Sequence, residues 1–152
     1  MPDFAAEIAL PDDVPGASIA VVSQDRIEWS RGFGVLEAGS SEPVTTDTLF
    51  QACSISKAVT AVAVLRLVQE GALRLDEDVN SYLISWKVPQ RSRRQPPVTI
   101  RALLSHTAGV NFPWSAGYHR EQEVPTLVEI LNGEKPSNYP AVEVVSTPGR
   151  KF

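Results

Sequence analysis

A long apolar segment, residues 54–70, is the feature that most constrains how this chain folds. Its apolar side chains cover most of the circumference of a helix; they are Ala58, Val59, Ala61, Val62, Ala63, Val64, Leu65, Leu67 and Val68. A helix that is apolar nearly all round is normally buried. Gly71 follows at the position where a left-handed glycine ends many helices. The sequence therefore predicts a central, buried helix that needs other parts of the protein around it.

A serine and a lysine stand three residues apart where this helix begins. Residues i and i+3 share one helix face, so Ser54 and Lys57 are expected to point into one site. The unpaired N–H groups and the positive end of the helix dipole also lie there, which favours a serine that becomes alkoxide-like. Lys57 is the only nearby group able to accept the serine proton. The pattern is short and also arises by chance, with Ser54 as an ordinary helix-start residue and Lys57 reaching into solvent.

The segment before the helix predicts a β-hairpin. Residues 17–23 are rich in β-branched side chains, residues 24–25 suit a turn, and residues 26–30 alternate apolar with polar side chains. The second strand can continue through residue 35. Two strands alone are marginally stable in water, and elsewhere only residues 142–145 look strand-like. The hairpin is therefore expected to need further strands.

The remainder of the chain predicts short helices separated by long, proline-rich loops. Asp76 is the proposed cap of a helix that reaches residue 83, and Thr99 is the proposed cap of one that reaches residue 104. Thr126 and Glu129 form a capping-box pattern for a third helix, which reaches residue 131. Asn132 and Gly133 would stop the last of these.

Composition excludes several function classes. The chain has 152 residues, is 43% hydrophobic and carries a net charge of −4, which fits one globular domain and gives no general case for binding nucleic acid or an anionic membrane. No apolar run approaches the ~20 residues of a membrane span. No signal peptide is visible at the start, so a cytoplasmic location is expected, with a periplasmic or secreted one left open. The single cysteine, Cys53, excludes an internal disulfide and is interpreted as a small buried filler.

The histidines do not make a convincing alternative site. No Gly-x-Ser-x-Gly elbow exists to support a Ser-His-Asp arrangement. His106 is interpreted as a hydrogen-bonding residue at a helix end, and His119 as a solvated loop residue. Two isolated histidines make a poor metal site, and no metal or cofactor is expected.

A basic, proline-ended stretch occupies residues 90–97. A nucleic-acid patch is one interpretation of it. Because no aromatic or basic residues continue the run, a solvated loop is the favoured interpretation.

Several segments, in order, resemble one family. Residues 50–57, which contain the Ser-x-x-Lys pair, residues 67–79 and residues 103–110 look like the serine β-lactamase-related hydrolases. The nearest branch contains class C β-lactamases, D-alanyl-D-alanine carboxypeptidases, D-aminopeptidases and similar esterases (family VIII type). Residues 15–17 and 148–152 also fit its pattern, so the resemblance runs from about residue 14 onward. It implies an α+β fold of the β-lactamase/transpeptidase type, an antiparallel sheet flanked by helices beside a mostly helical region, of which this chain is an incomplete part.

The resemblance also implies roles. Ser54 would be the acylated nucleophile, with its backbone N–H as half of the oxyanion hole, and Lys57 the general base. Substrates would be esters or amides, including β-lactams and D-peptides. The Ser-His-Thr-Ala-Gly segment, residues 105–109, would shape the edge of the site. Trp114 and Tyr118 would line the acyl pocket, or alternatively pack over the helical region.

The chain also departs from the family pattern. Family members carry a tyrosine motif shortly after a segment like residues 148–152, and a later Lys-or-His motif followed by Gly; neither is present here. Residues 1–152 are therefore interpreted as the N-terminal part of one β-lactamase-like domain: a hairpin (14–35), the nucleophile helix (54–71) and a helical and loop region (72–152). The chain alone is expected to be inactive and to need the remainder of the protein, in the same chain or a second one. Two alternatives stay open: a non-catalytic penicillin-binding sensor or scaffold, and a helical interaction domain with an incidental Ser-x-x-Lys.

Overall fold

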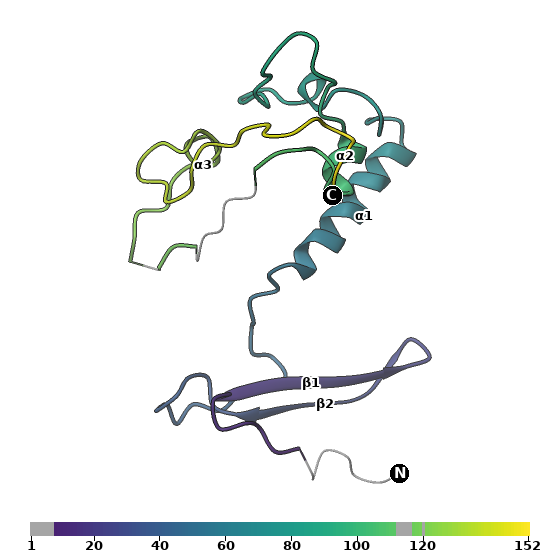
Figure 1. The fold of residues 1–152 in the computed structure, drawn as a ribbon. Helices are drawn as coiled ribbons and strands as arrows, with labels where there is room; N and C mark the ends of the chain where they lie inside the picture. The colour runs from purple at the N-terminus through teal and green to yellow at the C-terminus, as the bar shows by residue number, and fades with distance from the viewer. Residues whose placement is uncertain (1–7, 112–116, 120) are drawn as a thin grey trace. The chain divides into compact units, whose positions relative to one another are not determined.

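The computed structural model describes residues 8–111, 117–119 and 121–152. The chain divides into two compact units, Met1–Cys53 and Ser54–Phe152 (Figure 1). The first unit contains the strands and the second contains the helices. Trp114, a predicted pocket residue, lies outside the described residues.

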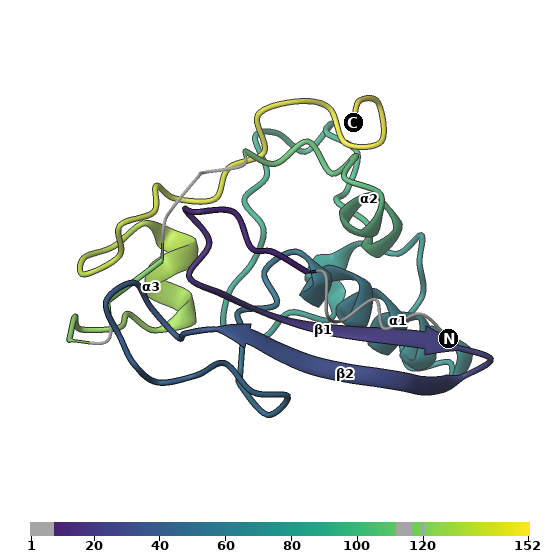
Figure 2. The same ribbon diagram turned by 90° about the horizontal axis from the view of Figure 1, so that it is seen from below.

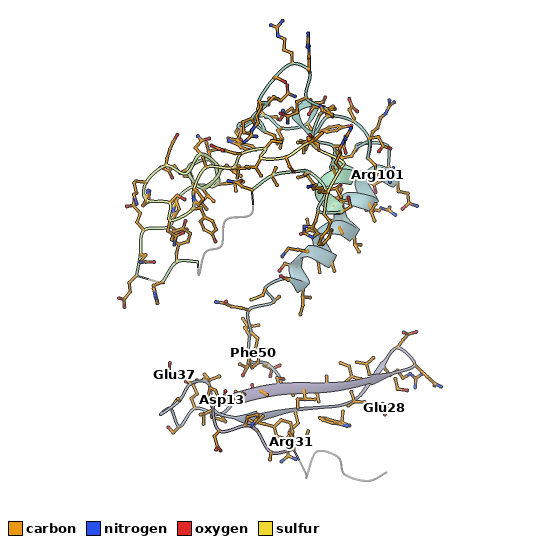
Figure 3. All side chains as sticks on the ribbon, viewed as in Figure 1. Asp13, Glu28, Arg31, Glu37, Phe50 and Arg101 are labelled. Carbon is orange, nitrogen blue, oxygen red and sulfur yellow. The ribbon has the colours of Figure 1, made fainter. Side chains whose placement is uncertain are left out.

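The first unit is built on the predicted hairpin. Strands β1 (Gly16–Ser23) and β2 (Arg26–Gly34) pair antiparallel in a two-stranded sheet (Figures 1 and 2). Gln24 and Asp25 form the turn with φ angles of 48° and 61°. Two successive residues in the left-handed region are typical of the tight turn whose twist matches that of the strands. On β2, the guanidinium of Arg31 lies 5.5 Å from the centre of the Phe33 ring (Figure 3).

Residues 43–45 fold back onto the hairpin and give this unit its small core. Val44 is buried, and its backbone N–H donates to the carbonyl of Gly34 at 3.1 Å. The approach is so close that a Cβ on Gly32 would lie 2.0 Å from the Val44 carbonyl oxygen, so only glycine fits there. Val22 and Ile27 stay exposed, and in the described part of the chain no further strand joins the sheet. The expectation that this hairpin needs more strands therefore stands.

Helix α1 (Ile55–Gln69) confirms the predicted central helix and its limits. Ser54 is its N-cap, Glu70 its C-cap, and Gly71 follows with φ of +76°. The prediction that this helix is buried is wrong for this structure: none of its residues, all of which are described, is buried. Val59 and Val62 are 66% and 69% exposed. The physical reason is one-sided packing, because only a face that includes Val64 packs against the core of the second unit.

The core of the second unit lies around helix α2 (Ile100–Leu104), and segments distant in sequence meet there. Its buried members are Val79, Val88, Val98, Ile100, Ala102, Ala108 and Val144. Val144, at 2% exposure the most buried of these, forms an isolated bridge with Val110. The predicted strand over residues 142–145 is thus reduced to a single bridge.

The first of the short helices begins later than predicted. A 3₁₀ turn, η2 (Val79–Ser81), takes its N-cap from Asp78, whose Oδ1 accepts a hydrogen bond from the Asn80 N–H at 2.9 Å. The prediction of Asp76 as the cap is wrong. Asp76 instead accepts two hydrogen bonds from Arg101 of α2, at 2.6 and 2.9 Å (Figure 3 labels Arg101). With its carboxylate engaged by that guanidinium, Asp76 is not available to cap a helix.

The other two helices confirm their predicted caps. The Thr99 hydroxyl accepts a hydrogen bond from the Ala102 N–H at 3.1 Å at the start of α2. Helix α3 (Leu127–Asn132) begins with the complete capping box of Thr126 and Glu129 and ends at Gly133, with φ of +66°. None of the helices among the described residues has the length and apolar character needed to cross a membrane.

Candidate active site

Ser54 occupies an unusual position for a helix-start serine. Its backbone is helical, with φ of −68° and ψ of −13°, and its side chain makes no capping hydrogen bond. The preceding residue, Cys53, has φ of +44° and is exposed, so its interpretation as a buried filler is wrong. A left-handed conformation at a non-glycine residue is strained, and such residues concentrate at functional sites. The Ser54 hydroxyl is therefore left unused by the helix and open to another partner.

That partner is Lys57. Its Nζ donates a hydrogen bond to Ser54 Oγ at 2.9 Å, across one turn of α1. The backbone N–H of Lys57 also donates to the Ser54 carbonyl at 3.1 Å, which fixes the first turn. The structure thus brings together the two side chains that the sequence pairs, at a distance suited to proton transfer in either direction. Their chemical roles stay a prediction.

The pair is exposed and stands at a helix start that offers hydrogen-bond donors. The first turn of α1 contains no acidic residue. Within the described residues, no group accepts a hydrogen bond from the Ser54 backbone N–H. That N–H therefore adds to the donors that a helix N-terminus offers to an anion. Both Ser54 and Lys57 are exposed.

A hollow of about 380 Å³ lies beside Lys57. Most of its lining is apolar; it is formed by Lys57, Leu103, His106, Ala108, Gly109, Val110 and Phe152. The segment that follows α2 therefore borders this hollow; the resemblance implies that residues 105–109 shape the edge of the site, which stays a prediction. Phe152 is a lining residue that sequence reasoning missed, because no local pattern signals that a residue so distant in sequence returns to Lys57.

The two histidines hold different places. His106 has φ of +55°, and its ring meets the Phe152 ring edge-on with centroids 5.7 Å apart. Its backbone N–H, rather than its side chain, bonds to the Leu103 carbonyl at 3.3 Å at the end of α2. His119 is exposed in a loop, as predicted. Among the described residues, no group of histidine, cysteine and acidic side chains is arranged to hold a metal ion.

Tyr118 is not among the residues that line the hollow beside Lys57. It lines a separate hollow of about 250 Å³ that shares no residue with the one beside Lys57. Its hydroxyl accepts a hydrogen bond from the Asn138 N–H at 3.3 Å, and its ring lies 6.2 Å from that of Tyr139. The acyl-pocket role of Tyr118 and the alternative, packing over the helical region, both stay predictions.

Comparison with known proteins shows to which family the chain belongs. A family model described as Beta-lactamase matches residues 4–151. The chain belongs to this family. The resemblance found in the Ser-x-x-Lys region is thereby confirmed, and the two-stranded sheet and the helices are parts of a β-lactamase-like α+β fold.

Individual relatives agree with this membership. Esterase EstB of Burkholderia gladioli is 36% identical over 97 residues, which are 64% of this chain and 25% of that protein. Penicillin-binding protein 4 of Amycolatopsis lactamdurans is 44% identical over 98 residues, again 64% of this chain and 25% of that protein. The octameric penicillin-binding protein homologue from Pyrococcus abyssi superposes with a TM-score of 0.55 at 34% identity, over 63% of this chain and 21% of that one. The chain spans about a quarter or less of the length of these relatives.

Proposed function

We propose that this chain carries the nucleophile of a serine hydrolase that works through an acyl-enzyme. The observation that carries the proposal is the 2.9 Å contact between Lys57 Nζ and Ser54 Oγ at the start of α1. A bare Ser-x-x-Lys is weak support, but here it stands in a member of the Beta-lactamase family, with its serine hydroxyl unused by the helix.

The proposed reaction uses this geometry directly. A neutral Lys57 takes the Ser54 hydroxyl proton as Oγ attacks the carbonyl carbon of an ester or amide. The backbone N–H of Ser54 donates to the oxyanion of the tetrahedral intermediate. Collapse of the intermediate breaks the bond to the leaving group, which takes the proton from Lys57, and leaves an acyl ester on Ser54. Water then adds to this ester and releases the acid.

The proposal requires more protein around the pair than these residues provide. A lysine accepts a proton at neutral pH only where its surroundings disfavour the charged form, as burial does, yet Lys57 is exposed here. The apolar faces of α1 and of the hairpin also need cover. We propose that residues 1–152 form part of one β-lactamase-like domain, and that the rest of the protein supplies this cover, the second oxyanion-hole donor and the remaining motifs.

Esters, β-lactams and D-peptides are the proposed substrate classes. An esterase and a penicillin-binding protein stand among the relatives at 36% and 44% identity, so their names support both ester and β-lactam chemistry. The mostly apolar hollow beside Lys57 suits the acyl part of such substrates better than a charged group.

Covalent labelling tests the proposal. Intact protein is treated with a fluorophosphonate probe and with a fluorescent penicillin, and the labelled peptide is identified by mass spectrometry. We expect the label on Ser54 and its loss in Ser54→Ala. Ser56→Ala is the matched control, because this serine lies two residues further along the same turn and should leave labelling intact. Aryl-ester hydrolysis at the parental rate by Ser54→Ala would refute the proposal.

A second candidate is a penicillin-binding sensor or scaffold that is acylated without turnover. The relative named penicillin-binding protein 4, the most identical of those described above, favours it. Acylation and release are separate steps, so the two candidates differ in the fate of the label. A penicillin label on Ser54 that persists for hours, without hydrolysis of aryl esters, would support the sensor over the hydrolase.

A further inference from the structure

A second hollow in the unit Ser54–Phe152 is lined by arginines. It measures about 500 Å³ and lies between the loop before α2 and the C-terminal segment after Val144. Figures 1 and 2 show these two stretches at the same end of the unit. We call it the arginine hollow; the residues that matter below are Arg91, Arg94, Gln95, Ser146, Thr147 and Arg150. It shares no lining residue with the hollow beside Lys57.

All the charged side chains that line the arginine hollow are positive. Its lining contains three guanidinium groups and no carboxylate. The described ion pairs join Arg66 to Glu70 and Arg101 to Asp76, so none neutralises these arginines. Glu143 lines an adjoining hollow together with Arg91 but does not pair with it. In a chain of net charge −4, this is a local concentration of positive charge that an anion would relieve.

A buried amide donor points to the same ligand. The Oε1 atom of Gln95 accepts a hydrogen bond from the Arg91 N–H at 3.1 Å, which fixes the orientation of the amide. Its Nε2 is left buried, and no described residue accepts a hydrogen bond from it. An unsatisfied buried donor is costly, and because Gln95 lines the hollow, a small shift of its amide would bring this donor to a ligand oxygen there.

The two walls of the hollow are held together by hydrogen bonds. Arg91 Nη1 donates to the Val145 carbonyl at 3.3 Å, which links the loop to the C-terminal segment. The C-terminal wall is also fixed to the segment after α2, because the N–H groups of Val145 and Ser146 both donate to the Gly109 carbonyl, at 2.7 and 3.1 Å. A site whose walls are already connected loses little conformational freedom on binding.

We propose that the arginine hollow binds a phosphate group, either free or on a small phosphate monoester. Guanidinium groups match the oxygens of phosphate with paired hydrogen bonds, and the Ser146 and Thr147 hydroxyls add further donors. A single-stranded nucleic acid is disfavoured, because no aromatic side chain lines the hollow to stack a base. This site goes beyond the proposed hydrolase function and does not depend on it.

Calorimetric titration of the intact protein with inorganic phosphate, at constant ionic strength set with chloride, tests the proposal. We expect saturable binding that weakens about tenfold in Arg94→Gln and in Arg150→Gln, since each loses charged hydrogen bonds. Gln95→Glu keeps the acceptor for Arg91 but places a carboxylate in the hollow, so binding should be lost. Arg93→Gln is the matched control, because Arg93 belongs to the same loop but does not line the hollow. Circular dichroism confirms that each variant is folded.

Further titrations identify the source of the phosphate and separate this site from catalysis. Tighter binding of glycerol 3-phosphate than of phosphate indicates a soluble monoester, and binding only to phosphatidic-acid vesicles indicates a lipid headgroup. Ser54→Ala should bind phosphate like the parent, whatever becomes of the hydrolase proposal. Absence of saturable phosphate binding, an equal loss in Arg93→Gln, or binding of an RNA oligonucleotide without competition by phosphate would overturn the proposal.

Discussion

Replacing Gly109 with alanine tests how the segment after α2 is held against the C-terminal segment. Gly109 has φ of +71°, which costs alanine about 1 kcal/mol relative to glycine. A Cβ there would also lie 2.4 Å from the Ser146 carbonyl oxygen, where carbon–oxygen contacts are normally about 3.3 Å. The segment must move by roughly 0.9 Å, which weakens the two hydrogen bonds accepted by the Gly109 carbonyl, at about 1 kcal/mol each. Together with the conformational cost, we expect the free energy of unfolding to fall by about 3 kcal/mol.

Urea unfolding of the intact protein, followed by circular dichroism, measures this loss from the midpoint at a constant m-value. Gly149→Ala is the matched control, because Gly149 has φ of +81° but nothing within 4 Å of a Cβ. It should lose only the conformational contribution of about 1 kcal/mol. A loss for Gly109→Ala no greater than that for Gly149→Ala would refute the steric argument. Gly109 also lines the hollow beside Lys57, so we expect slower probe labelling in the same variant.

Three further predictions follow from single contacts. Lys57→Arg keeps a long basic side chain, but a guanidinium stays protonated and cannot accept the serine proton, so the rate of ester hydrolysis should fall about a hundredfold or more. The hydroxyl and the backbone N–H of Thr126 both donate hydrogen bonds to the Glu129 carboxylate. They lower the pKa of this carboxyl below its usual 4.5, and the hydroxyl has the larger effect. The ionised Glu129 therefore stabilises the folded state above pH 4.5, and this contribution is lost as the pH falls through the lower pKa of the folded state. Thr126→Val removes the hydroxyl donor, so an NMR titration should show a higher pKa for Glu129. Val144→Ala should cost about 2–3 kcal/mol in urea unfolding, while the half-exposed neighbour Val145→Ala should cost under about 1 kcal/mol.

Local patterns in the sequence were sufficient for the limits of α1, α2, α3 and the hairpin. Helix α1 begins and ends within a residue of its predicted limits, because apolar composition, the Ser54 start and Gly71 all act within a few residues. The capping box of Thr126 and Glu129 likewise depends on residues three apart. The approach of Lys57 to Ser54 belongs to the same class, since one helical turn is enough to bring them together.

The errors have two sources, contacts between distant segments and local backbone conformation. Asp76 was predicted to cap a helix, but Arg101, 25 residues later, engages its carboxylate. Cys53 was predicted to be buried, because a small apolar residue usually is, but it stands in an exposed left-handed turn. Residues 142–145 have strand-like side chains, yet only Val144 pairs, because a strand requires a partner of matching length.

The sequence by itself determined the hairpin, helix α1, the capping box of α3, the family and the candidate pair at the start of α1, since each depends on a short pattern or on several motifs in order. Only the tertiary structure decided that Phe152 returns to the hollow beside Lys57, that Tyr118 lines a different hollow, and that Arg91 and Arg150 line one hollow. These outcomes depend on the packing of segments far apart along the chain around Val144 and α2. Such packing is set by the fit of many side chains together, and no local pattern encodes it.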